Sequence, residues 1–195
     1  MKSENNPSHP KPGEPWDEDM ADWYVERYGE HPLNALAVEA AALVGTETVV
    51  DIGCGSGAAV RAAEVCLTMG KAIGVDPSPA MVKIAKSLSQ THIEFIEGSA
   101  ELIPLDDMSV DVVLAVNSLH HWYDVPGGLL EVARVLNKTG RLILVEEIFE
   151  DEARGMDGGE ICSTLEASSF RVSATTTHEL EDCRAHLFSA QWVAK

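Results

Sequence analysis

The sequence predicts an α/β fold with a doubly wound, largely parallel sheet. Five buried-type strands alternate with helices over residues 49–145, a pattern that predicts parallel strands joined by right-handed crossovers. Two strand-like stretches, 170–177 and 186–193, are separated by a short turn and predict a closing antiparallel hairpin. A glycine-rich turn follows the first strand, at the edge where such sheets bind their ligands.

The individual elements follow from local signals. β-branched runs predict the strands, whereas apolar stripes at helical spacing, with prolines in first turns, predict the helices. The expected strands are 49–52, 71–75, 92–97, 110–116, 141–145, 170–177 and 186–193. The expected helices cover part of 16–28, then 32–44, 58–69, 79–88, 126–136 and 161–168, with a turn at 137–140.

A length of 195 residues suits one domain, which we place at 16–195. Residues 1–15 are polar and rich in proline, so we expect a mobile N-terminal tail. Aromatic side chains at helical spacing follow it. Residues 16–31 are therefore a possible lid segment, although packing of these rings on the domain would explain the same pattern.

The net charge of −18 at pH 7 disfavours nucleic acid and anionic membrane surfaces as partners. No apolar run approaches the roughly 20 residues of a membrane helix, and the polar start does not resemble a secretory signal. The four cysteines form no Cys-x-x-Cys pair, which favours free thiols in a reducing compartment. We therefore expect a cytoplasmic protein without a metal site.

The glycine turn admits two ligands. Gly53 and Gly55, with Ala58, satisfy the dinucleotide pattern Gly-x-Gly-x-x-Ala. Asp51 argues against this interpretation, because its carboxylate would face a pyrophosphate of like charge. A carboxylate suits a ligand that ends in an ammonium group. A third possibility is that Gly53, Gly55 and Gly57 only permit tight packing.

Asp76 ends the second strand, about 20 residues beyond the glycine turn, where an acid accepts hydrogen bonds from ribose hydroxyls. Both ligand interpretations use such a residue, so Asp76 predicts an adenosine group without choosing between them. The alternative is a plain turn aspartate before Pro77.

These motifs resemble the class I S-adenosylmethionine-dependent methyltransferases of the small-molecule type (methyltransferase type 11, ubiquinone-biosynthesis-like). The family's first motif is an acid followed by Gly-x-Gly-x-Gly, as in 51–57. Residues 98–105 resemble its Gly-Asp-Ala-Glu-x-Leu-Pro segment, and 120–122 its His-His-Trp. The resemblance implies a Rossmann-like sheet of seven strands in the order 3-2-1-4-5-7-6 with the last strand antiparallel. It also implies S-adenosylmethionine as cofactor, S-adenosylhomocysteine as product, and a monomer or homodimer.

The resemblance implies a set of residues that bind the methyl donor. Ser99 departs from the family, which has aspartate there, so adenine contact is expected to be weaker or to pass through water. The implied cofactor-binding residues are Asp51, Gly53, Gly55, Gly57, Asp76, Pro77, Met81, Ser99, Ala100, Asn117 and Leu119.

His120 is the candidate catalytic residue, as a general base for an acceptor that must lose a proton. An unperturbed imidazole titrates near ~6.5 and suits that role. The alternative is that His120 and His121 pack against the sheet with their nitrogens bonded to backbone. Glu146 and Glu147 follow the fifth strand and either face the acceptor or are solvated.

The predicted function is methyl transfer from S-adenosylmethionine to a small-molecule acceptor. Two alternatives stay open: a non-catalytic subunit that binds an adenosyl ligand, and an NAD-dependent oxidoreductase, which Asp51 disfavours.

Overall fold

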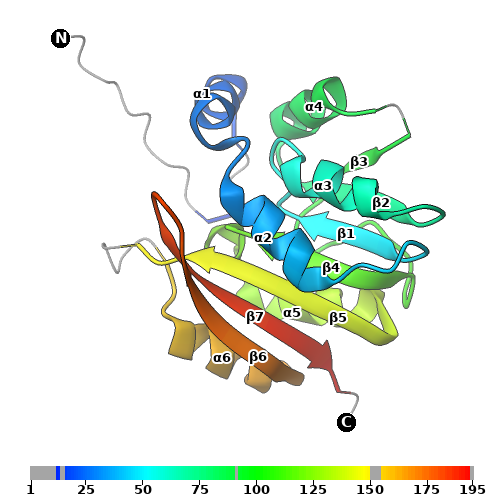
Figure 1. Cartoon of the computed structure of the whole chain (residues 1–195), viewed down its shortest axis with the longest axis vertical. Helices are drawn as coiled ribbons and strands as arrows, with labels where there is room; N and C mark the ends of the chain where they lie inside the picture. Colours follow the sequence, from blue (N-terminus) through cyan, green and yellow to red (C-terminus); the bar gives the residue numbers. More distant parts are fainter. Residues whose placement is uncertain (1–11, 14–15, 91, 150–154, 194–195) are drawn as a thin grey trace.

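The computed structural model describes residues 12–13, 16–90, 92–149 and 155–193, and its centre is one seven-stranded sheet (Figure 1). The strand order is β3-β2-β1-β4-β5-β7-β6, which confirms the predicted order. The strands are β1 (Thr48–Ile52), β2 (Lys71–Asp76), β3 (Glu94–Glu97), β4 (Val110–Val116), β5 (Leu136–Glu147), β6 (Phe170–Glu179) and β7 (Arg184–Trp192).

Pairing within the sheet is parallel except around its last strand. β1 pairs in parallel with β2 and β4, and β4 with β5. β7 is antiparallel to both β5 and β6, so the predicted antiparallel hairpin is confirmed. All carboxyl ends of β1, β2 and β4 therefore meet at one edge, which is where the glycine turn lies.

Helices cover both faces of the sheet (Figure 1). Apolar residues of α2 and α3 pack on one face, and those of α5 and α6 on the other. The helical elements are α1 (Glu18–Tyr28), α2 (Pro32–Ala41), α3 (Ala58–Cys66), α4 (Pro79–Leu88), the 3-10 helix η1 (Leu119–His121), α5 (Val125–Val135) and α6 (Gly158–Ala167).

The prediction of a turn at 137–140 is wrong, because these residues lie within β5. Leu136 pairs with Val110 and Arg141 with Val112, so residues 137–140 bulge out between two paired positions. The Asn137 side chain bonds Asp111 across this bulge. Because of this register shift, the chain that follows α5 pairs with β4 on both sides of the bulge.

Several predicted boundaries also shift. α2 ends at Ala41 rather than 44 because Ala42 adopts a left-handed conformation, with φ 47°. α3 ends at Cys66 rather than 69, and β3 begins at Glu94 rather than 92. The four cysteines are free, as predicted.

The N-terminal helix α1 packs on α4. Its Ala21 lies against Ala80 and Met81, and Asp17 caps it by accepting a hydrogen bond from the Met20 amide at 2.9 Å. Most of the predicted tail over 1–15 lies outside the described residues. Within the described residues, no helix is long and apolar enough to cross a membrane.

Candidate functional site

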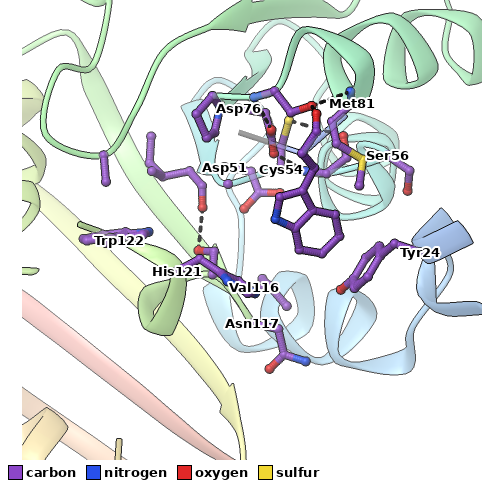
Figure 2. Close-up of a pocket in the computed structure, with 18 of the residues that line it drawn as sticks. Tyr24, Asp51, Cys54, Ser56, Asp76, Met81, Val116, Asn117, His121 and Trp122 are labelled. Carbon is purple, nitrogen blue, oxygen red and sulfur yellow. Dashed lines mark hydrogen bonds between the residues drawn. The ribbon is translucent and has the colours of Figure 1, made fainter. Parts of the chain in front are cut away.

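A cavity of about 220 Å³ lies at the carboxyl edge of β1, β2 and β4, between the sheet and the N-terminal segment (Figure 2). Three of the predicted residues do not line it: Gly57, Leu119 and His120. The predicted residues that do line it are Asp51, Gly53, Gly55, Asp76, Pro77, Met81, Ser99, Ala100 and Asn117.

The turn after β1 needs its glycines for different reasons. Gly53, Gly55 and Gly57 have φ of 73°, 52° and 81°, which other residues adopt at a cost. A Cβ on Gly53 would lie 2.5 Å from Ser118, and one on Gly57 would lie 2.6 Å from Phe95. At Gly55 nothing lies within 4 Å, so the space above this residue is open to a ligand. Packing alone therefore accounts for two glycines and not for the third.

Asp51 is a buried acid with an unsatisfied oxygen. The residue is 3% exposed, and its Oδ1 has no hydrogen-bond partner within the part of the chain that the structure describes. Burial, and then the nearby Asp76 carboxylate, raise the pKa of Asp51 to about 8. A buried carboxyl group of this kind is stabilised as the anion only by a cation or by hydrogen-bond donors. The cavity thus has one wall that selects for positive charge.

Asp76 ties two ligand-facing loops together. Its Oδ2 accepts a hydrogen bond from the Gly55 amide at 2.8 Å, and its Oδ1 accepts one from Ser78 at 2.9 Å. Burial raises the pKa of Asp76 to about 6, and these two backbone bonds oppose the shift. The bond from Ser78 shows that Asp76 also stabilises the turn after β2, which is the alternative role that the sequence allowed. Its contact with ribose stays a prediction, for which each oxygen retains a second lone pair.

Trp122 contributes an unpartnered donor that sequence reasoning missed. Its side chain is buried against Gly128 and Ala100, and its Nε1 has no hydrogen-bond partner. Figure 2 shows the indole at the end of the cavity near His121. Of the three such atoms in the described residues, two thus belong to cavity residues, Asp51 and Trp122. The His-His-Trp segment was the only sequence signal for it.

Asn117 stands at the end of β4 in a left-handed conformation, with φ 49°. Its side-chain Oδ1 accepts a hydrogen bond from the backbone N–H of Glu147 at 2.7 Å. The backbone N–H of Asn117 donates to the Val145 carbonyl at 2.8 Å. Asparagine tolerates this conformation better than most residues. The bonds to β5 hold the backbone turn that leads into η1.

His120 lies outside the cavity and is paired with a carboxylate. Its Nδ1 is 2.6 Å from Oε2 of Glu146, a residue that is 3% exposed. Oε1 of Glu146 accepts a hydrogen bond from the Leu119 amide at 2.7 Å. The sequence left open that His120 bonds backbone and that Glu146 is solvated. In this contact His120 has a side-chain partner, and Glu146 is buried. Glu147 is only partly buried, and His121, rather than His120, lines the cavity.

The segment formed by residues 12–13 and 16–31, here called the strap, closes the cavity. The Gly13 amide donates to the His121 carbonyl at 2.9 Å, and Ser78 Oγ donates to the Trp16 carbonyl at 2.6 Å. The Trp16 ring lies 4.7 Å from Tyr24 and 5.5 Å from His121. The strap thus runs from the β4 side to the β2 side, and its rings form a cavity wall.

The polar groups that line the cavity fit S-adenosylmethionine. Asp51 offers an anion to an ammonium group, and Trp122 offers an N–H to an adenine nitrogen or a carboxylate. The open space above Gly55 allows close approach to the backbone. In the described residues, no group of three or more side chains is arranged to hold a metal ion.

Comparisons with known proteins find methyltransferases. A family model described as a methyltransferase domain matches residues 50–144. The uncharacterized methyltransferase YcgJ of Bacillus subtilis is 35% identical over 115 residues, which cover 57% of this chain and 45% of that protein. The ubiquinone/menaquinone biosynthesis C-methyltransferase UbiE of Campylobacter jejuni is 35% identical over 103 residues, 50% of this chain and 43% of that protein.

The matched segments span less than half the length of both curated relatives. A crystal structure of a SAM-dependent methyltransferase from Aquifex aeolicus superposes with a TM-score of 0.78, covering 90% of this chain and 98% of that one. Its 19% identity makes this a likeness of fold alone. The matched domain and these relatives make the chain similar to methyltransferases over residues 50–144, and its strand order is the one that the resemblance to the class I S-adenosylmethionine-dependent methyltransferases implied.

Proposed function

We propose that this protein transfers the methyl group of S-adenosylmethionine to a small-molecule acceptor. The observation that carries the proposal is Asp51, whose buried Oδ1 has no partner at the head of the cavity. A cationic amino-acid end supplies that partner, whereas the diphosphate of a dinucleotide would add a second negative charge.

The chain's own contribution is to bind, orient and exclude water. Asp51 would hold the cationic end, Asp76 the ribose, and Ser99 with Ala100 the adenine. The bound donor supplies an already electrophilic methyl group, so the barrier falls mainly through positioning. The strap rings and the buried carboxylates would keep water from the reacting atoms.

Three features support a small acceptor. The described part of the strap forms one wall of the cavity and narrows the space at the donor site from that side. The charge of −18 opposes nucleic-acid substrates. UbiE, which shares the matched segment, is named for quinone biosynthesis.

Calorimetry with three ligands tests the donor assignment. We expect S-adenosylmethionine and S-adenosylhomocysteine to bind and NAD to show no binding. Asp51→Asn should weaken donor binding by about tenfold or more, because a charged hydrogen bond is lost. Asp106→Asn is the matched control, since that exposed acid lies before β4 at the opposite end of the strand. Tight NAD binding would refute the assignment.

Methyl transfer itself is tested in cell extract. Incubation with isotopically labelled S-adenosylmethionine, followed by mass spectrometry, should yield a labelled small molecule that depends on the protein. Donor binding without any labelled product would instead favour a non-catalytic subunit. Label found only in macromolecules would contradict the proposed acceptor class.

A further inference from the structure

The pair formed by Glu146 and His120 lies beside the donor cavity without lining it. Glu146 is the only buried glutamate in the described part of the chain. It extends from the carboxyl end of β5 to η1, which follows β4. An acid is costly to bury unless its oxygens have hydrogen-bond partners.

Both oxygens of Glu146 are engaged. Oε1 accepts the Leu119 amide proton at 2.7 Å, which fixes the carboxylate relative to η1. Oε2 lies 2.6 Å from His120 Nδ1. A carboxylate only accepts hydrogen bonds, so this contact places a proton on Nδ1. In the neutral ring the lone pair is then on Nε2, and Nε2 is the basic nitrogen.

The position of the ring connects this pair to the donor site. His120 packs at 4.1 Å from the ring of His121, which lines the cavity, and at 5.4 Å from Phe149. It therefore stands between the donor cavity and the residues that follow β5. A role for this ring in catalysis therefore requires that the acceptor bind next to the donor cavity, at His120.

We propose that Glu146 is a positioning residue that holds His120 in the Nδ1–H tautomer, so that Nε2 removes a proton from an acceptor with an ionisable hydroxyl group. This inference rests on the proposed function and specifies its acceptor class, a phenol or an enol. The Glu146 carboxylate stabilises the imidazolium that results, as carboxylates do for catalytic histidines elsewhere.

The proposed reaction begins with one proton transfer. The hydroxyl proton moves to His120 Nε2, and the electron pair of the O–H bond stays on oxygen. That pair makes the oxygen, or a carbon conjugated with it, nucleophilic toward the methyl group. The bond between the methyl carbon and sulfur breaks as the new bond forms, and its electron pair stays on the sulfur of the departing S-adenosylhomocysteine. His120 then returns the proton to solvent. An amine that reacts through its free lone pair needs no such base.

The tautomer is measured directly by NMR of the full chain with nitrogen-15-labelled histidine, at a pH high enough for a neutral ring. His120→Gln assigns the signal. We expect a protonated Nδ1 and an unprotonated Nε2 in the wild type. In Glu146→Gln the side-chain amide donates to Nδ1, so the proton should move to Nε2.

A matched control comes from the second carboxylate–histidine pair, Glu64 with His92, which lies on the surface. Glu64→Gln should alter the His92 signals and leave those of His120 unchanged. A wild-type His120 protonated on Nε2 would overturn the proposal, and so would an unchanged tautomer in Glu146→Gln. If Glu146→Gln does not fold, the wild-type spectrum alone decides.

Kinetics on the acceptor identified in extract separate positioning from stability. Glu146→Gln and His120→Gln should each lower the single-turnover rate by about 10²–10⁴-fold, and the double variant should lose no more than either one. Donor affinity should stay unchanged. Loss of donor affinity together with rate would show a structural role and overturn the proposal. A methylated product without an enol or phenol oxygen would overturn the acceptor class.

The two proposals fail differently. A wild-type protein that binds no S-adenosylmethionine but shows the Nδ1–H tautomer refutes the proposed function and leaves the orientation of His120 by Glu146 standing. Donor binding and methyl transfer with the opposite tautomer would refute only the role of Glu146.

Discussion

Asp51 and Trp122 require opposite hydrogen-bonding groups from a ligand in the cavity. The first presents an acceptor oxygen and the second a donor nitrogen, and neither has a hydrogen-bond partner among the described residues. Unpaired buried groups are costly to a fold, each by about 1–3 kcal/mol. Their persistence on one cavity wall is most simply explained by a ligand that pairs both.

Donor binding should release a proton near pH 7. Without ligand, the pKa of Asp51 is about 8, so the group is largely protonated there. A cationic ligand favours the anion and lowers that pKa, which expels up to one proton. Calorimetry in two buffers of different ionisation enthalpy measures it. Asp51→Asn should bind without this release, and equal heats in both buffers for the wild type would contradict the prediction.

Trp122→Phe should weaken donor binding by roughly fivefold, or about 1 kcal/mol, because it removes one hydrogen bond and keeps the ring. Stability without donor should not fall, since the lost N–H has no partner in the described structure. Equilibrium dialysis and thermal unfolding measure the two effects. Trp192→Phe on β7 is the control, and equal affinities of both variants would exclude the contact.

The strap is held mainly by contacts at its two ends. Gly13 bonds His121, Trp16 bonds Ser78, and Ser56 Oγ donates to the Gly29 carbonyl at 2.9 Å. α1 adds a small apolar contact with α4. Ion pairs of Glu18 with Lys83 and of Glu30 with Arg61 add to these contacts. Because none of them belongs to the hydrogen-bond ladder of the sheet, we expect this segment to detach more easily than the sheet.

Trp16→Ala should therefore speed the dissociation of S-adenosylhomocysteine by about fivefold, because an aromatic contact worth about 1 kcal/mol leaves the closed state. Stopped-flow fluorescence measures the rate. Trp23→Ala is the matched control, since Trp23 packs on Arg27 and Tyr28 outside the cavity lining. Slower dissociation in Trp16→Ala would show that this ring competes with the ligand instead of covering it.

The stability of the whole domain should depend on the two buried acids. Burial raises the pKa values of Asp51 and Asp76 to about 8 and about 6 in the folded state, against an ordinary value of 3.8. The folded state then binds more protons, so the free energy of unfolding falls as pH rises from about 4 to about 8. Salt bridges act in the opposite sense: Arg141 and Arg134 lower the pKa of Glu47 and Glu131, whose contribution is lost only at more acidic pH.

Urea unfolding across this pH range measures the effect without donor. Asp51→Asn should flatten the curve and raise stability near pH 8 by about 2 kcal/mol, since a buried acid no longer ionises on unfolding. Saturating donor should remove much of the wild-type slope. A wild-type stability that rises steadily between about pH 5 and pH 8 would contradict the two raised pKa values.

Sequence reasoning predicted what local pattern and chain order determine. Alternating strands and helices predicted the parallel sheet, the family resemblance implied the strand order, and the glycine turn located the cavity edge. The bulge at 137–140 was missed because it depends on pairing with Val110 and Val112, 26 to 29 residues away. The turn-like composition of that stretch favoured a loop.

The side-chain partners in the site were less predictable for the same reason. That Glu146 bonds His120, and not solvent, depends on how β4 and β5 align. The unpartnered Trp122 nitrogen is a property of three-dimensional packing, and no sequence pattern records it. The roles of the predicted binding residues, of His120 and of the strap stay predictions.

The cavity has two walls of different origin, one from strand ends in the sheet and one from the detachable strap. Mutations in the strap can thus reshape the enclosure while the glycine turn, Asp51 and Asp76 stay intact. On the proposed function, changes in the described part of the strap would recruit new acceptors during evolution and leave the residues proposed to bind the methyl donor intact. Exchange of this segment between homologues is the corresponding engineering route.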